Sequence, residues 1–458
     1  MKTNNIFKGL CLALAACASL AVTSCKDEPD AYEIQGGKPT INFIRPVSVE
    51  AKDSIITAAS MRSTVCVVGE NLRSVTALFF NDQPAVLNTS YMTDHTLIVT
   101  VPNEIPDLVT DKIYFVTQSK DTVAYDFHVI IPAPVVSSMS NEWAAAGEEV
   151  TIVGDYFLDY EEFPLTVNFG DYVLPRSAIK SITKNRITFV MPEGVPHEKV
   201  SVESIYGETQ GAFKYMDNRG MLFDFDTPWK DGAPVLGNHG WHARTITSDG
   251  TSLSGNYLVM GGGAAMGEDG GWNDKDFSFE YWAGDWGDPE SYPSHPRISD
   301  LADFSDFENL NLKFEMNIPA DYAWSAAPMQ IYFGSVTQVS NSAAGAKDIY
   351  GNTLAGTNNT FFHEQGKLNR ALYMPWKDTE DKLYHTDGKW VTVTIPLTDF
   401  NMDYDGNKID KFFTSTADFG CFNIFIIRGG YDDKSALPTG VACTPFIKID
   451  NIRVVPNK

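Results

Sequence analysis

Residues 64–72 read TVCVVGENL, and residues 149–157 read EVTIVGDYF. In both segments an apolar, β-branched run ends at a glycine, which predicts a strand followed by a turn where glycine supplies a positive φ. A second short apolar run follows each segment, and a third run ends at Pro102 in the first copy and at Pro192 in the second. Because proline cannot donate to a strand ladder, it marks the end of an edge strand. The sequence therefore predicts two copies of one small β-domain.

The rest of the chain also has the pattern of strands and shows no long stretch with helical periodicity. From Leu312 to Ile318, apolar side chains alternate with polar ones, which predicts a strand with one buried face. Further short apolar runs occupy residues 329–333, 390–395, 421–427 and 446–455. The last run loses its alternation at Asp450 and Asn451, which predicts a β-bulge. We predict an all-β protein in which two small β-domains precede a C-terminal β-sandwich of the jelly-roll type.

The first residues of the chain indicate export and lipidation. The apolar run 9–22 is too short to span a bilayer and has the form of a signal peptide. Small residues then lead to Cys25, which an acidic run follows at once. This pattern resembles the cleavage box and surface-export signal of Bacteroidetes lipoproteins. The resemblance implies that residues 1–24 are removed, that Cys25 is lipidated at the outer face of the outer membrane, and that residues 25–37 form a tether.

The charge of the chain excludes some classes of function. The 458 residues contain 35 Lys and Arg against 59 Asp and Glu, a formal net charge of −24. Such a chain repels phosphate backbones and anionic lipid, so we expect no nucleic-acid binding and no electrostatic attachment to a membrane. Hydrophobic residues make up 43% and charged residues 21%, which is typical of globular domains rather than of disordered chains.

Cysteine and acidic residues give little sign of a cofactor. Outside the signal peptide and Cys25, the chain has Cys66, Cys421 and Cys443, with no CxxC pair and no histidine at metal-ligand spacing. Cys421 and Cys443 suit a disulfide between neighbouring strands and equally suit two buried thiols. No cofactor is predicted. A structural calcium ion is considered only at three acidic residues, Asp224, Asp226 and Asp450.

Tryptophan is concentrated in the last domain. Eight of the nine tryptophans lie between Trp229 and Trp390, in loops rich in Gly, Asp and Asn. A sugar ring presents a flat patch of C–H bonds that packs against an aromatic face, while neighbouring polar side chains bond to its hydroxyls. We therefore expect exposed Trp and Tyr on these loops to bind a neutral polysaccharide. The candidate residues are Trp376, Tyr373, Trp286, Trp241, Trp324, Trp282 and Arg370.

The clearest candidate is the segment 370–376, RALYMPW. Pro375 fixes its own φ and favours an extended residue before it, so Tyr373 and Trp376 are expected to be held in one arrangement. The charged run 377–381 places the segment near solvent and favours a platform, although both rings would also fill a sandwich core.

The other candidates differ in their surroundings. Glycines and aspartates around Trp286 predict an exposed loop, whereas Trp282 ends an alternating run and suits the core as well. Trp241 and Trp324 lie in turn-like segments that suit either place. Trp390 opens a regular strand and is predicted to be structural.

The layout of the chain resembles a known family. The two repeats are similar to IPT/TIG domains, over residues 38–132 and 133–217, and this resemblance implies two immunoglobulin-like sandwiches. Together with the lipobox cysteine, the run GKWVTVTIPL at 388–397 and the closing strand FIKIDNIRVV at 446–455, they resemble the type B surface glycan-binding proteins of Bacteroidetes polysaccharide-utilisation systems.

This resemblance implies a function and partners. Residues 218–458 would bind a polysaccharide, for which we predict a plant β-glucan or hemicellulose such as xyloglucan. Tyr373 and Trp376 resemble the aromatic platform of the family, and the two preceding domains would act as a spacer. A porin-type glycan transporter and its binding lipoprotein are the implied protein partners.

Catalytic motifs are missing from the sequence. His363 and Glu364 are not followed by the second histidine of HExxH, and residues 250–255 lack the register of a GxSxG elbow. A carboxylate pair for glycoside hydrolysis can always be drawn from 59 acidic residues, so a surface glycoside hydrolase stays an alternative. A protein-binding adhesin or uptake-complex subunit is another, because interfaces also favour Trp and Tyr. We predict a binding protein without catalytic activity.

Overall fold

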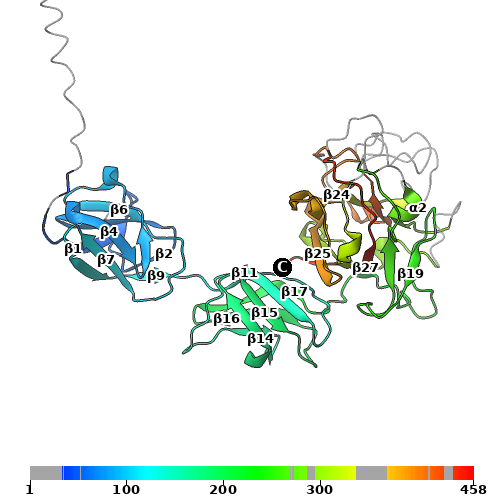
Figure 1. Ribbon diagram of the computed structural model, residues 1–458, viewed down its shortest axis with the longest axis horizontal. Helices are drawn as coiled ribbons and strands as arrows, with labels where there is room; N and C mark the ends of the chain where they lie inside the picture. The colour runs from blue at the N-terminus through cyan, green and yellow to red at the C-terminus, as the bar shows by residue number, and fades with distance from the viewer. Residues whose placement is uncertain are drawn as a thin grey trace, which may run out of the picture. The chain divides into compact units, whose positions relative to one another are not determined.

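The computed structural model describes residues 33–34, 36–51, 53–268, 270, 273–285, 294–336, 369–410, 413–427 and 437–458. The chain divides into two compact units, residues 1–132 and 133–458. Their sheets are antiparallel except for one short parallel pair, so the all-β prediction is confirmed (Figure 1). Among the described residues, no helix has the length and apolarity needed to cross a membrane.

The first unit is an immunoglobulin-like sandwich. One sheet has the order β1 (Thr40–Pro46), β3 (Thr64–Glu70), β6 (Thr96–Thr100), and the other β5 (Gln83–Ala85), β4 (Val75–Phe80), β7 (Lys112–Thr117), β8 (Thr122–Asp126). The parallel pair is β2 (Ala58–Ser60) with β9 (His128–Ile130). Alternate side chains such as Val65, Leu78 and Phe115 are buried, as the period of two in a strand requires.

The second unit begins with a sandwich of the same plan. Its sheets are β10 (Val135–Met139), β11 (Glu149–Asp155), β15 (Arg186–Val190), β14 (Ile179–Thr183), and β13 (Tyr172–Val173), β12 (Thr166–Phe169), β16 (Lys199–Ser204), β17 (Gly207–Lys214). The order β10-β11-β15 repeats the order β1-β3-β6, with the quoted segments at its centre. The predicted repeat is therefore present in the fold.

The repeated glycine has a different cause from the one predicted. A Cβ on Gly69 would lie 2.0 Å from the Thr40 carbonyl oxygen, and one on Gly154 would lie 1.8 Å from the Val135 carbonyl oxygen. Neither glycine has a positive φ; that conformation falls two residues later, at Asn71 in the first copy, where φ is 59°. Close approach of the neighbouring strand, rather than a turn, requires glycine in both copies.

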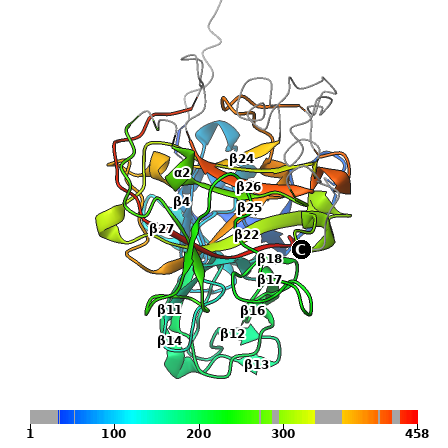
Figure 2. The same ribbon diagram turned by 90° about the vertical axis from the view of Figure 1, so that its right-hand side faces the viewer.

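The C-terminal domain is a sandwich of two unequal sheets. The larger has the order β19 (Thr245–Thr247), β20 (Tyr257–Met260), β27 (Ile447–Pro456), β22 (Leu310–Asn317), β25 (Trp390–Pro396), with β18 (Met221–Phe223) also paired to β27. The smaller has the order β21 (Ser278–Tyr281), β26 (Cys421–Ile426), β23 (Met329–Gly334), β24 (Arg370–Tyr373). In Figure 2, β24 and β26 lie above β25 and β22. An aromatic-rich core, including Phe279, Phe314 and Phe422, fills the space between the sheets.

The predicted bulge is present in β27. Lys313 pairs with Arg453, but Glu315, two residues on, pairs with Asp450, so β27 has one extra residue at this point. Asn451 has a φ of 52°, a conformation that Asn tolerates better than most residues. The bulge is therefore confirmed at the position where the sequence loses its alternation.

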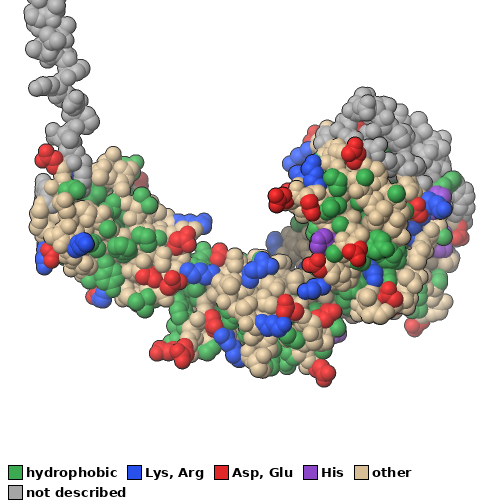
Figure 3. Space-filling model, viewed as in Figure 1, with side chains coloured by type: hydrophobic (Ala, Val, Ile, Leu, Met, Phe, Trp, Pro, Cys, Tyr) green, Lys and Arg blue, Asp and Glu red, His purple; other side chains and the backbone are tan. Residues whose placement is uncertain are grey.

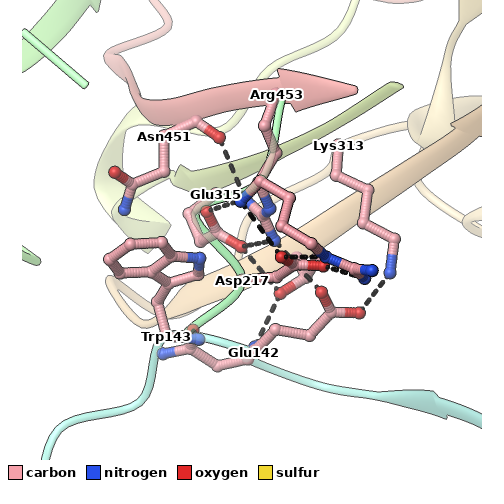
Figure 4. Close-up of polar contacts among 10 residues, drawn as sticks. Glu142, Trp143, Asp217, Lys313, Glu315, Asn451 and Arg453 are labelled. Atoms are coloured by element: carbon pink, nitrogen blue, oxygen red, sulfur yellow. Dashed lines mark hydrogen bonds and ion pairs between the residues drawn. The ribbon is translucent and has the colours of Figure 1, made fainter. Parts of the chain in front are cut away.

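Both faces of β22 are buried, although the sequence predicts one buried face. The outer face packs against the preceding immunoglobulin-like domain. Glu142 of that domain accepts hydrogen bonds from Lys313 Nζ at 2.5 Å and Arg453 Nη2 at 3.1 Å, and Arg453 also bonds to Glu315 at 2.7 and 3.0 Å (Figure 4). Polar residues in this alternating strand thus meet a second domain rather than solvent.

Candidate functional site

Trp376 and Trp324 lie in the core. The 3-10 helix η8 (Pro375–Asp378) turns the Trp376 ring inward, and its exposed fraction is 0%. The indole N–H groups of Trp376 and Trp324 both donate to the Ala327 carbonyl oxygen, at 3.3 and 3.1 Å. The expectation that Trp376 forms an exposed platform is wrong, because proline at the start of a helical turn redirects the side chain. Trp324 is likewise sealed from solvent.

Tyr373 and Arg370 do not form a platform with Trp376 either. The half-buried Tyr373 ring faces the core, 6.0 Å from the Trp324 ring, and burial raises its hydroxyl pKa. Arg370 points to the opposite face of β24 and is fully buried, where it donates to Gln330 Oε1 at 2.7 Å. Successive strand residues face opposite sides of a sheet, so this alternation separates the predicted set.

The structure buries two of the other tryptophans discussed above and does not describe a third. Trp282 follows β21 and is buried beside Cys421 and Tyr332, so it too is not an exposed ring. Trp286 lies outside the described residues, as does Cys25. Trp390 is buried and donates to the Thr251 carbonyl oxygen at 2.8 Å, as its structural assignment predicts.

Trp241 is the predicted ring that the structure places at the surface. Its exposed fraction is 59%. The loop that carries it runs beside β21, where His239 forms a parallel bridge with Tyr281. The Trp241 backbone N–H donates to Glu280 Oε2 at 2.9 Å, and the Asn238 side chain accepts from the Glu280 N–H at 2.9 Å. An exposed indole on a loop that buried groups hold in place is a prearranged apolar surface.

Buried charge supports this loop from below. Glu280 lies on the outer face of β21 and is buried, with the Arg244 guanidinium 3.9 Å from its Oε1. Arg244 also donates to the Ser278 carbonyl and hydroxyl oxygens and to the Lys275 carbonyl oxygen. Because an unpaired buried carboxylate is costly, this set fixes the backbone of the Trp241 loop. Glu280 and Arg244 were not predicted from the sequence.

A polar row crosses the whole four-stranded sheet on the same face. The strand registers align Glu280 with Asn423, Asn423 with Tyr332, and Tyr332 with Arg370. The Arg370 guanidinium lies 5.1 Å from the Tyr332 ring centroid, a cation–π distance. Neighbouring strands are about 4.8 Å apart, so the row spans about 14 Å. It begins beneath the Trp241 loop and ends at β24.

Asn423 is the unusual member of this row. It is fully buried at the centre of β26, and neither its amide nitrogen nor its amide oxygen has a hydrogen-bond partner among the described residues. A buried amide without partners costs about 1–3 kcal/mol, and water or a ligand usually relieves that cost. The sequence signal for it is one polar residue inside the apolar run 421–427.

A groove adjoins the far end of the row, at the edge strand β24. Its volume is about 610 Å³, and Leu372, which shares the outer face with Arg370, lines it. Its wall combines apolar side chains such as Met374 with polar ones such as Thr394 and Asn401, and it also includes the charged residues Lys377, Asp399 and Lys408. Such a lining offers both apolar area and hydrogen-bonding groups to a ligand.

The structure shows the state of two cysteines and the positions of the aspartates that were considered for calcium. Cys421 and Cys443 are free thiols, so they do not form a disulfide. Asp224 accepts from two backbone N–H groups, those of Asp226 and Thr227. Among the described residues, the three aspartates considered for calcium do not gather into a group that could share an ion.

On the face drawn in Figure 3, acidic and basic side chains are interspersed rather than collected in one patch.

Comparison with known proteins agrees with this architecture. Residues 215–456 match the family model of the surface glycan-binding protein B xyloglucan binding domain, and residues 134–216 match the IPT/TIG domain. The crystal structure of the surface glycan-binding protein PbSGBP-B from Prevotella bryantii is 61% identical, with a TM-score of 0.79; the match covers 92% of this chain and 100% of that chain.

Two further relatives are more distant. An SGBP-B from a complex xyloglucan utilization locus in Bacteroides uniformis is 15% identical, with a TM-score of 0.40, over 92% of this chain and 100% of that chain. An IPT/TIG domain-containing protein of Bacteroides ovatus is 30% identical over 149 residues, which is 31% of this chain and 29% of the relative's length.

These matches bear on the predicted class of function. The family that covers more than half of the chain is one of non-catalytic proteins that bind glycans at the cell surface. The prediction of a binding protein rather than a glycoside hydrolase is therefore confirmed. The chain belongs to the surface glycan-binding protein B family.

Proposed function

We propose that the C-terminal domain binds a neutral β-glucan, with xyloglucan as the first candidate, and that Trp241 is the ring on which a sugar packs. The description of the matching family model supports the choice of glycan. The exposure of Trp241 on a braced loop supports the choice of residue and is the observation on which the proposal rests.

The chemistry of this region suits a sugar polymer. The Trp241 face offers apolar area without charge, and the loop that carries it has little freedom to lose on binding. One sugar-ring contact is weak, so affinity should rise with chain length as further contacts along the domain engage the same polymer. The groove beside β24, lined by apolar, polar and charged side chains, is the place for such a further contact.

Replacing Trp241 with Ala tests the proposal. We expect binding of xyloglucan by the purified protein, measured by calorimetry, to weaken at least tenfold, because the apolar contact is lost. The melting temperature should not change, because the side chain is largely exposed.

Tyr322→Ala is the matched control. Tyr322 is another exposed ring of the same domain, at 44%, and it lies against Phe446 rather than near the Trp241 loop. It should bind xyloglucan as the unchanged protein does, and no reducing sugar should appear in any sample. Loss of binding in Tyr322→Ala, with Trp241→Ala unaffected, would contradict the assignment of the ring.

We propose further that lipid on Cys25 anchors the protein to the outer membrane, where it hands glycan to a porin-type transporter and its binding lipoprotein. The apolar run before Cys25 and the acidic run after it support the anchor. Cys25→Ala should move the protein from the membrane fraction to the soluble fraction of cells. Unchanged fractionation would count against the anchor and leave the glycan-binding proposal unaffected.

A further inference from the structure

Three side chains with metal-binding atoms meet beside the Trp241 loop. His239, Asp285 and His295 each offer one ligand atom, and these atoms lie within 4.8 Å of one another. The three residues come from separate points of the chain, so their meeting is a product of the fold. Two imidazoles with one carboxylate form a donor set that suits zinc and related divalent transition metals.

The orientation of His239 is fixed by the backbone. Its Nδ1 lies 2.8 Å from the Trp282 carbonyl oxygen, and a carbonyl can only accept, so Nδ1 carries the proton. The lone pair is then on Nε2. Histidine ligands of metals are commonly held in this way, with one ring nitrogen bonded to a carbonyl and the other turned to the ion.

His295 has a ring nitrogen without a hydrogen-bond partner among the described residues. Its Nδ1 is buried and has no hydrogen-bond partner among the described residues, since Asp285 Oδ1 lies 3.6 Å away, beyond hydrogen-bond length. Burial and the neighbouring His239 ring lower the pKa of His295. The backbone on either side is tied down, because the Gly284 N–H donates to the His295 carbonyl oxygen at 2.8 Å.

The two rings are stacked: their centroids are 3.3 Å apart and their planes differ by 8°. The in-plane lone pairs of parallel rings do not converge, so one imidazole has to turn for a nitrogen of each ring to bind the same ion, at Zn–N bonds of about 2.0–2.1 Å. Asp285 is exposed, and one of its carboxylate oxygens lies within 4.8 Å of the two imidazole ligand atoms.

We propose that His239, Asp285 and His295 bind a divalent transition-metal ion, with zinc as the reference ion, and leave at least one position to water. The ion would join the loop of Trp241 to the segments that carry Asp285 and His295. This inference does not depend on which glycan the protein binds.

A second group, with two carboxylates and one histidine, provides the internal control. Glu70, Asp94 and His95 in the first unit also lie within metal-sharing distance. There, however, the exposed His95 ring already bonds through Nδ1 to Glu70 at 2.9 Å. A solvated ion pair of this kind has no unused buried nitrogen, so we expect it to bind metal much more weakly.

The experiment is a titration of zinc into the purified, chelator-treated protein, followed by calorimetry and by melting temperature. We expect one tight site and a melting temperature raised by zinc. His295→Ala should weaken zinc binding at least tenfold and abolish the rise in melting temperature, whereas His95→Ala should change neither.

Melting temperatures measured in the presence of chelator test whether the substitution itself disturbs the fold. His295→Ala and the unchanged protein should melt at the same temperature when no metal is present. Cobalt supplies an independent readout, because a four-coordinate site with histidine ligands gives visible absorption that His295→Ala should lose. Absence of a tight zinc site, or zinc binding that His295→Ala retains, would overturn the proposal; so would binding that only His95→Ala removes.

Discussion

The outer faces of the two sheets in the C-terminal domain are both polar and both buried, yet their polar groups are satisfied differently. On the larger sheet, Lys313, Glu315 and Arg453 form ion pairs with one another and with Glu142 of the preceding domain. On the smaller sheet, Asn423 is buried at the centre of the row and has no hydrogen-bond partner in the described parts of the chain.

This difference separates a structural face from a candidate binding face. The charges on the larger sheet have protein partners, so they fix how the immunoglobulin-like domain packs against the sandwich (Figure 4). The row on the smaller sheet starts beneath an exposed tryptophan loop and leaves hydrogen-bonding capacity unused. Buried polarity alone therefore does not indicate a site; a buried amide that lacks a partner at both its nitrogen and its oxygen, as Asn423 does, is the stronger indication of one.

The largest effect is expected from removing Glu142, which pairs with the buried charges on the outer face of the larger sheet. Glu142→Ala leaves Lys313 and part of Arg453 as buried charge without compensation, which costs about 3–5 kcal/mol. We expect a large fall in the melting temperature of the second unit, measured by calorimetry, with xyloglucan affinity preserved at temperatures where the protein is folded.

Glu149→Ala is the control for that substitution. Glu149 pairs with Lys180 on the exposed surface of the same domain, so its loss should leave the melting temperature unchanged. Equal effects of Glu142→Ala and Glu149→Ala would mean that the buried network does not stabilise the packing of the domains.

A smaller effect is expected from Asp450, which lies on the same face as Glu315. Burial raises the pKa of Asp450 to about 8, and the carboxylates of Glu315 and Asp226 add to that rise. The folded state then binds a proton that the unfolded state releases near pH 4. The contribution of Asp450 to the free energy of unfolding is therefore most favourable below that pH and falls as the pH rises toward 8.

Asp450→Asn should remove this dependence. Between pH 5 and pH 8 the unchanged protein should lose about 3–4 kcal/mol relative to the variant, measured by denaturant unfolding at several pH values. Parallel stability curves for the two proteins across this range would show that Asp450 is ionised in the folded state throughout.

Much of the fold follows from local sequence. Strand alternation and the repeated glycine–proline plan predict two copies of one small β-domain, and the interruption at Asp450 and Asn451 predicts the bulge. These features depend on neighbours along the chain or on one adjacent strand. The prediction that the repeated glycine supplies a positive φ was wrong. Gly69 is required by the nearby carbonyl of Thr40, which belongs to a strand about thirty residues away in the sequence.

The candidate site was predicted only in part. The turn that buries Trp376 depends on Pro375, but the carbonyl that accepts its N–H belongs to Ala327, which no local pattern reveals. Trp241 was among the predicted rings, whereas the residues that hold its loop were not. Their contacts join residues 238–244 to residues 275–280, which lie about thirty to forty residues further along the chain, and the hydrophobic pattern leaves that pairing undetermined.

A crystal structure of the protein with a xyloglucan oligosaccharide is the most direct test of the account. We predict that a sugar ring packs on the Trp241 face and that the remaining contacts stay on the side of the four-stranded sheet. An oligosaccharide bound over the six-stranded sheet, or in either immunoglobulin-like domain with Trp241 untouched, would contradict it.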